Sequence, residues 1–214
     1  MAVAALLREY LIKAQDYLAE KEYKEQKGEL FKRDLRMESL IPVLKKELPL
    51  KAHAHRADDI MTILRIAREF DIKVTLDHCT EGHLIAEEIA RSGFPAIVGP
   101  TLSGKTKVEL AESSFSTPGI LAKAGVMVAI MSDHPVVPTE NLPVYAALAV
   151  KAGMPEEEAL KAITINPAII LGIDDRVGSI EPGKDADLVI FDGHPLDIQA
   201  KVKRVFINGE EVMD

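Results

Sequence analysis

The stretch Leu50-Lys51-Ala52-His53-Ala54-His55 begins a rhythm that decides the fold class of this 214-residue chain. It is a short apolar run that ends in histidine. The same pattern returns at residues 74–79 (VTLDHC) and, with an aspartate before the histidine, at residues 126–134 (VMVAIMSDH). Amphipathic helix patterns lie between these runs. Nearly all-apolar strands that alternate with helices predict a parallel α/β sheet buried on both faces.

Outward from this stretch, periodicity and turn residues predict the other elements. Strands are expected at residues 50–55, 72–78, 95–98, 126–131, 187–192, 202–207 and 211–213, and helices at residues 2–27, 36–47, 58–70, 82–92, 117–124, 141–153, 155–164 and 166–171. Asp58 is expected to cap its helix. Asn208-Gly209 predicts a tight hairpin, so the end of the chain should be a small β element rather than another strand–helix unit.

The composition restricts the classes of protein to be considered. Hydrophobic residues make up 47% of the chain, which is enough for a substantial core. The net charge of −8 argues against a nucleic-acid surface, and no apolar run reaches the roughly 18–20 residues that span a bilayer. We therefore expect neither nucleic acid nor membrane as a partner. The single cysteine, Cys79, and a start without signal-peptide features favour a cytoplasmic protein.

Three of the predicted strands end in residues of the types that bind metals. His53, His78 and Asp133 lie at the carboxyl ends of strands expected to be parallel, which meet at one edge of the sheet. His53 and His55 should point to the same face, because side chains alternate along a strand. Two imidazoles and a carboxylate suit Zn²⁺ or another first-row divalent ion, and the carboxylate could take a proton from an activated water.

Each of these residues also has an ordinary structural interpretation. A histidine at a strand end is often hydrogen-bonded structure, and an aspartate after a strand is often a helix cap or a turn residue. The residue pattern alone therefore leaves a ligand set and a set of structural residues as open alternatives.

Other catalytic interpretations compete for the same region. Ser132-Asp133-His134 and the pair His78-Cys79 contain nucleophile and base types, but neighbours on a strand face opposite ways and cannot relay a proton to one another. Residues 99–106 (GPTLSGKT) match a phosphate loop, which would make the chain a P-loop NTPase with Asp133 near Mg²⁺. That fold needs more parallel strands after the loop than this sequence offers, and it leaves the histidines unexplained.

Residues 53–55 (HAH), 76–82 (LDHCTEG) and 132–135 (SDHP) resemble strands five, six and eight of the amidohydrolase superfamily, above all imidazolonepropionase-like enzymes. The tail, with TINPA at residues 164–168 and GSIEPGKDADLV at residues 178–189, is similar to the characteristic end of that family. The resemblance implies that residues 1–175 form the C-terminal part of a (β/α)₈ barrel, strands five to eight. Residues 176–214 would then belong to a small composite β domain.

The resemblance also implies a chemistry and roles for named residues. The expected activity is hydrolysis of amide or cyclic amide C–N bonds in small molecules or small peptides, through a water activated by Zn²⁺ or another divalent metal. His53, His78 and Asp133 would be the metal ligands, with Asp133 also the catalytic base. His55, Arg56 and His134 would contact the substrate.

Two parts of the family's pattern do not occur in this sequence. The 25 positions from His53 to His78 leave room for one strand–helix unit, so residues 53–55 are not the early His-x-His pair of strand one. The strand-four residue that bridges two metals is also missing, and a full barrel needs about 250 residues. We therefore expect a half-barrel that self-associates or binds a complementary N-terminal half. A non-catalytic, complementing subunit is the alternative to an enzyme.

Overall fold

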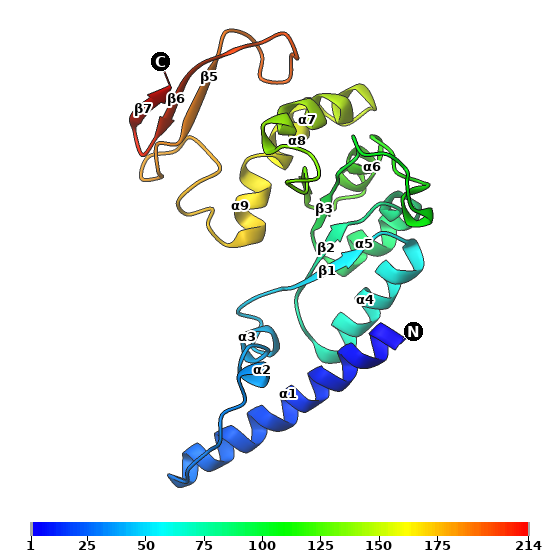
Figure 1. The fold of residues 1–214 in the computed structure, drawn as a ribbon, viewed down its shortest axis with the longest axis vertical. Coiled ribbons are helices and arrows are strands. Elements are labelled where there is room, and N and C mark those ends of the chain that lie inside the picture. Colours follow the sequence, from blue (N-terminus) through cyan, green and yellow to red (C-terminus); the bar gives the residue numbers. More distant parts are fainter. Residues whose placement is uncertain (1, 214) are drawn as a thin grey trace. The chain divides into compact units, whose positions relative to one another are not determined.

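The computed structural model describes residues 2–213, and none of the helices in that range is long and apolar enough to cross a membrane. The described chain divides into two compact units. One comprises the residues up to Ala52 together with Asp58–Thr75, and the other comprises His53–Ala57 together with the chain from Leu76 onward. Figure 1 shows the order of helices and strands along the chain.

The first unit is built around one long helix, α1 (Ala2–Lys27). Leu11 and Ala14 of α1 are fully buried, whereas most of its last turns are exposed, as the charge run at residues 20–27 predicts. Arg8 pairs with Glu69 of α4 (Ala57–Phe70) at 2.7 Å. Helix α4 itself has a strongly one-sided pattern and buries Ile60, Leu64, Ile66 and Ala67.

The helix predicted at residues 36–47 is wrong in one respect, because the structure has two short helices there. These are α2 (Leu35–Glu38) and α3 (Ile41–Leu44), separated by a turn at Ser39 and Leu40. Pro42 has no backbone N–H and its ring would clash with the preceding turn, so a helix from residue 36 cannot continue through it. Pro42 instead lies in the first turn of α3, the one place in a helix that tolerates proline.

A four-stranded parallel sheet forms the centre of the fold, in the order β1-β2-β3-β4. Its strands are β1 (Leu50–Ala54), β2 (Val74–His78), β3 (Ala96–Val98) and β4 (Val128–Ile130). In the two parallel registers Leu76 lies opposite Ala96, and Ala96 lies opposite Val128. Every residue of β4 and most of β2 are buried, which confirms the α/β fold class and the buried parallel sheet expected from the apolar runs.

Short helices follow the strands and then cover β4. The predicted helix at residues 82–92 begins as a 3₁₀ turn, η1 (Gly82–Ile85), before α5 (Ala86–Ser92). Helices α6 (Thr117–Lys123), α7 (Leu142–Lys151), α8 (Glu156–Ala162) and α9 (Ile165–Leu171) all pack against β4. Helix α9 ends at Leu171, as predicted, and Gly172 follows it in the left-handed conformation.

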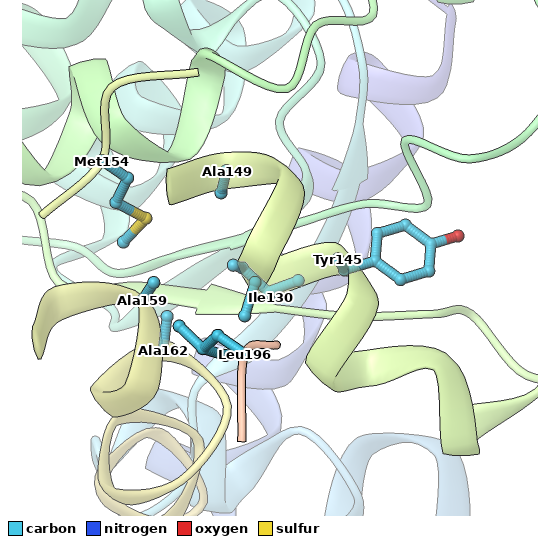
Figure 2. Packing of buried hydrophobic residues seen from close by; sticks show 8 residues of the cluster. Ile130, Tyr145, Ala149, Met154, Ala159, Ala162 and Leu196 are labelled. Carbon is cyan, nitrogen blue, oxygen red and sulfur yellow. The ribbon is translucent and has the colours of Figure 1, made fainter. Parts of the chain in front are cut away.

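One hydrophobic cluster of the second unit joins β4 to these helices. Figure 2 shows Ile130 of β4 among residues of α7 and α8 and their neighbours, including Tyr145, Ala149 and Met154. Leu196 comes from the far end of the chain and packs on the same cluster. Small alanine side chains of α7 and α8 are part of this cluster, which packs Ile130 of β4 against the helices.

The end of the chain forms an antiparallel sheet of β5 (Leu188–Phe191), β6 (Val202–Ile207) and β7 (Glu210–Met213). Asn208 and Gly209 join β6 to β7 with φ values of 51° and 81°. Two positive φ angles in a two-residue loop define the type I′ hairpin, so the predicted turn is confirmed.

Candidate metal centre

Three histidines meet where β1 and β2 end. His53 and His55 lie two positions apart, so they share a face, and their Nε2 atoms are 3.0 Å apart. The ring of His78 lies 4.2 Å from that of His53 and 4.4 Å from that of His55, measured between ring centroids. One nitrogen from each of the three rings lies within 4.8 Å of the other two. His55 and His78 are buried and His53 is exposed, so the cluster opens to solvent on one side.

A hydrogen bond to the main chain orients His78. Its Nδ1 lies 2.8 Å from the carbonyl oxygen of Gly99, directly after β3. A carbonyl oxygen only accepts, so Nδ1 carries the hydrogen and Nε2 keeps a free lone pair. Gly99 has φ of 142°, and a Cβ on it would lie 2.1 Å from the carbonyl oxygen of Met131. Only glycine fits here, and the position of the carbonyl depends on it.

A buried threonine holds His55 on the other side of the cluster. Nδ1 of His55 lies 2.8 Å from Oγ1 of Thr80, and both residues are buried. Burial, with smaller contributions from the neighbouring His78 and His53, lowers the pKa of His55 from its usual 6.5 to about 4. His55 is therefore neutral at pH 7, which is the form of imidazole that binds metals.

The turn after β2 fastens the ends of β1 and β2 together. The backbone N–H of Cys79 donates to the carbonyl of Ala54 (3.0 Å), and that of Glu81 donates to the carbonyl of His55 (2.8 Å). The carboxylate of Glu81 accepts a hydrogen bond from the backbone N–H of Ala57, the first residue of α4. The carboxylate of Glu81 therefore pairs with the first backbone N–H of α4. Asp58 lies inside the first turn, so its predicted capping position is wrong.

Cys79 does not provide a nucleophile to this centre. Its side chain is fully buried, and desolvation raises the pKa of its thiol to about 12. The thiol therefore stays protonated at neutral pH, in agreement with the expectation that His78 and Cys79 do not form a catalytic pair.

Asp133, expected as the third ligand, does not join the three histidines in the described chain. It is exposed, has φ of 54°, and follows β4, whereas His78 ends β2. Two strands of separation correspond to about 10 Å across a sheet. His134 is also exposed, next to Asp133, and Arg56 is exposed next to His55. The structure thus brings together His53 and His78 as predicted, adds His55 as a donor, and leaves Asp133 apart.

A glutamate that sequence reasoning did not single out lies beside the cluster. Oε1 of Glu109 is 3.9 Å from Nε2 of His55 and 3.4 Å from Nζ of Lys107. Glu109 lies in a 3₁₀ turn, η2 (Val108–Leu110), in the long connection after β3. Thr80 and Gly99 were missed as well. Thr80 and Gly99 lie within the quoted stretches 76–82 and 99–106, but no pattern in the sequence indicates their contacts with the histidines, because each of the three residues acts through a contact made only in the folded chain.

Residues 99–107 do not form the strand–loop–helix unit of a phosphate-binding loop. No helix begins at Lys105 and Thr106 in the described chain, and the next element is η2. Nζ of Lys105 donates to the carbonyl of Ala111 at 2.7 Å. Without a following helix, the loop lacks the helix N-terminus that such loops use to bind phosphate.

The donor set of the cluster suits a first-row divalent metal ion. Imidazole nitrogens favour Zn²⁺, Cu²⁺, Fe²⁺ and Ni²⁺ over the harder Mg²⁺ and Ca²⁺. Two imidazole nitrogens that bind one Zn²⁺ at about 2.0–2.1 Å in a tetrahedron lie about 3.3 Å apart. The observed 3.0 Å between the Nε2 atoms of His53 and His55 is close to that spacing. Hydrogen bonds from the far nitrogens of His55 and His78 match the arrangement that orients histidine ligands in metal sites.

Comparisons with known proteins agree with the fold. The profile of the amidohydrolase family matches residues 45–212, and the chain belongs to that family. Among curated proteins, it is 37% identical over 175 residues to an imidazolonepropionase of Thermoplasma volcanium, covering 78% of this chain and 42% of the relative. It is 31% identical over 170 residues to the imidazolonepropionase of Treponema denticola, covering 78% and 36%. The chain thus spans less than half of either enzyme.

Solved structures also place this chain among the amidohydrolases. The crystal structure of an amidohydrolase from Thermotoga maritima is 47% identical with a TM-score of 0.94, and the match covers 98% of this chain and 55% of that one. A Xaa-Pro dipeptidase with bound methionine is 22% identical with a TM-score of 0.64, a likeness that concerns the fold alone. The resemblance to imidazolonepropionase-like amidohydrolases is therefore confirmed.

Proposed function

We propose that this chain is the C-terminal half, strands five to eight, of a metal-dependent (β/α)₈ amidohydrolase that cleaves C–N bonds of amides or cyclic amides. The observation that carries the proposal is the cluster of His53, His55 and His78, with one nitrogen of each within 4.8 Å of the others, in a chain of the amidohydrolase family. The substrate class follows the imidazolonepropionases, whose name denotes a cyclic amide, and extends to small peptides.

The residues of this chain divide into two groups in the proposed reaction. His53 and His78, with His55 beside them, would hold the cation, which is Zn²⁺ or another divalent transition metal, and Asp133 would complete the set as ligand and base. When bound, such a cation polarises a carbonyl and eases the loss of a proton from water. Asp133 takes that proton as the water attacks the carbonyl carbon, and later returns it to the leaving nitrogen. Arg56 and His134 bind the substrate.

Asp133 lies outside the histidine group in the described chain, after the end of β4. In a closed barrel the strand ends face one another across the rim, so a cation held there by His53 and His78 could also be reached by Asp133. We therefore propose that the working enzyme has the sheet closed, through self-association or through a complementary N-terminal half. The chain's match to only 55% of the Thermotoga amidohydrolase supports this.

Metal content and turnover together test the proposal. The purified chain, alone and with the N-terminal half of the Thermotoga amidohydrolase, is analysed for metal and assayed on cyclic and linear amides, for wild type and Asp133→Asn. Bound transition metal and a rate that Asp133→Asn lowers by about 10² or more would support the proposal. Equal rates for both forms would exclude Asp133 from the mechanism.

A second function is favoured by the position of Asp133, which is exposed and outside the histidine group. The chain would then be a complementing subunit that keeps the fold without catalysis. Stable binding of metal, combined with no turnover of any amide in the assembled state, would favour this candidate over the enzyme. The predicted domain boundary after residue 175 and the predicted cytoplasmic location stay predictions.

A further inference from the structure

The loop after β3 brings a carboxylate to the histidine cluster that none of the roles above uses. Oε1 of Glu109 lies 3.9 Å from Nε2 of His55, the same nitrogen that lies 3.0 Å from His53. Because Nδ1 of His55 is engaged with Thr80, Nε2 is the atom that faces both His53 and Glu109. Glu109 therefore lies near Nε2, the nitrogen with which His55 would bind a cation.

The local backbone keeps Glu109 at this place. The turn η2 is closed by hydrogen bonds from the backbone N–H of Leu110 to the carbonyl of Lys107 (3.0 Å) and from that of Ala111 to the carbonyl of Val108 (3.1 Å). Lys105 adds a bond from its side chain to the carbonyl of Ala111. The main chain around Glu109 is thus fixed on both sides, while its side chain remains 38% exposed.

Electrostatic attraction would favour binding of the Glu109 carboxylate to a cation among the histidines. Imidazole donors bring no negative charge. With Asp133 apart from them in the described chain, His53, His55 and His78 would leave the full charge of a divalent cation uncompensated, and His55 and His78 are buried. One carboxylate would halve that charge, and histidines with a carboxylate are a common donor set for Zn²⁺. Two donors of a tetrahedral Zn²⁺ lie about 3.3 Å apart, so the 3.9 Å between Oε1 of Glu109 and Nε2 of His55 exceeds that spacing by only about half an ångström.

We infer that Glu109 is a fourth protein donor of the metal centre, held away from it by Lys107 until a cation binds. Oε1 of Glu109 is shared between His55 and Nζ of Lys107, at 3.9 Å and 3.4 Å. A cation among the histidines competes with Lys107 for the same oxygen. Removing Glu109 should therefore weaken metal binding, and removing Lys107 should strengthen it. The inference rests on the proposed metal site and adds a donor from this chain.

Calorimetric titration of the metal-free chain with Zn²⁺ tests the inference, with circular dichroism of each metal-free variant to establish folding. Glu109→Gln should lower the affinity about 10- to 100-fold, and Lys107→Gln should raise it. Glu112→Gln is the matched control, since Glu112 is an exposed glutamate three positions along the same loop, and its affinity should equal that of the wild type.

The outcomes separate this inference from the proposed function. If the wild type binds Zn²⁺ and the dissociation constant of Glu109→Gln is within twofold of the wild-type value, Glu109 is not a donor. The proposed metal site would still stand in that case. A loss of affinity in Asp133→Asn together with unchanged affinity in Glu109→Gln would assign the carboxylate to Asp133 instead. If the wild type binds no transition metal at all, the metal site itself is refuted, and the inference with it.

Discussion

Nδ1 of His78 donates a hydrogen bond of 2.8 Å to the carbonyl oxygen of Gly99, and this bond connects the end of β2 to the loop after β3. It determines which nitrogen of His78 is free to bind a metal. The carbonyl can take this position only because residue 99 has no side chain, since a Cβ there would overlap the carbonyl of Met131. The orientation of His78 for the proposed metal binding thus depends on a glycine that is not itself a proposed ligand.

Replacing that glycine should disturb stability and metal binding together. Gly99→Ala should cost about 3 kcal/mol or more of unfolding free energy, because it combines a forbidden φ with a backbone clash. Zn²⁺ affinity should fall as well, since His78 loses its orientation. The matched control is Gly93→Ala, where φ is 73° but a Cβ would meet nothing, so only about 1–2 kcal/mol should be lost and affinity should be retained. Urea unfolding and zinc titration measure both, and equal effects of the two substitutions would contradict the account.

Zinc itself should stabilise the chain through the histidine cluster. At a free concentration of 100 times its dissociation constant, a ligand that binds only the folded state adds about 2.7 kcal/mol. His78→Ala should remove this stabilisation, whereas His194→Ala should keep it, because His194 is half-exposed and pairs with Glu156 instead. Thermal unfolding with zinc and with EDTA gives the comparison. Stabilisation that survives in His78→Ala would place the metal elsewhere.

Acid should destabilise the metal-free chain in a defined pH range. Burial gives His55 a pKa of about 4 in the folded state, against about 6.5 in the unfolded state, so the unfolded chain takes up a proton first as the pH falls. Stability is unaffected above pH 6.5, falls between pH 6.5 and 4, and loses about 3 kcal/mol from this residue over that range.

Chemical denaturation in EDTA at several pH values measures this slope. His55→Gln removes the titrating group, so its unfolding free energy should vary less between pH 6.5 and 4 than that of the wild type. An identical pH dependence in both proteins would mean that His55 is not the group responsible.

The open edges of the sheet should make the chain associate. β1 and β4 are the outermost strands of the sheet, and each has one side without a strand partner in the described chain. Exposed strand edges pair readily with other strands. Sedimentation velocity over a range of concentrations should therefore show dimers or larger species that a complementary N-terminal half converts to a single complex. A monomer at all concentrations, without a partner, would contradict this prediction.

The sequence predicts those parts of the fold that depend on local pattern. Apolar runs locate the four parallel strands, and Asn208-Gly209 locates the last hairpin, because both signals lie within a few residues of the element they define. The helix at residues 36–47 fails because the effect of Pro42 depends on where the helix starts. In a helix that starts at residue 36, Pro42 lies in the second turn and breaks the helix, whereas in α3, which starts at Ile41, it lies in the first turn and is tolerated.

The candidate site is predictable only in part. His53 and His78 stand out because they end apolar strands, and strand alternation places His55 with His53. The contacts of His55 with Thr80 and Glu109 cross 25 and 54 positions of sequence and obey no period. Asp133 was expected beside the histidines because the rim of a closed barrel was assumed, whereas the described sheet has four strands and open edges.

The buried thiol of Cys79 can report local unfolding of the turn that follows β2. It is the chain's only cysteine, and it is fully shielded in the turn that joins the ends of β1 and β2. A thiol-specific dye can reach it only when that turn opens, so the labelling rate measures local opening beside the histidines without any engineered probe. A bound cation or a bound partner half should slow the labelling, each by an amount that measures how strongly it holds the turn closed.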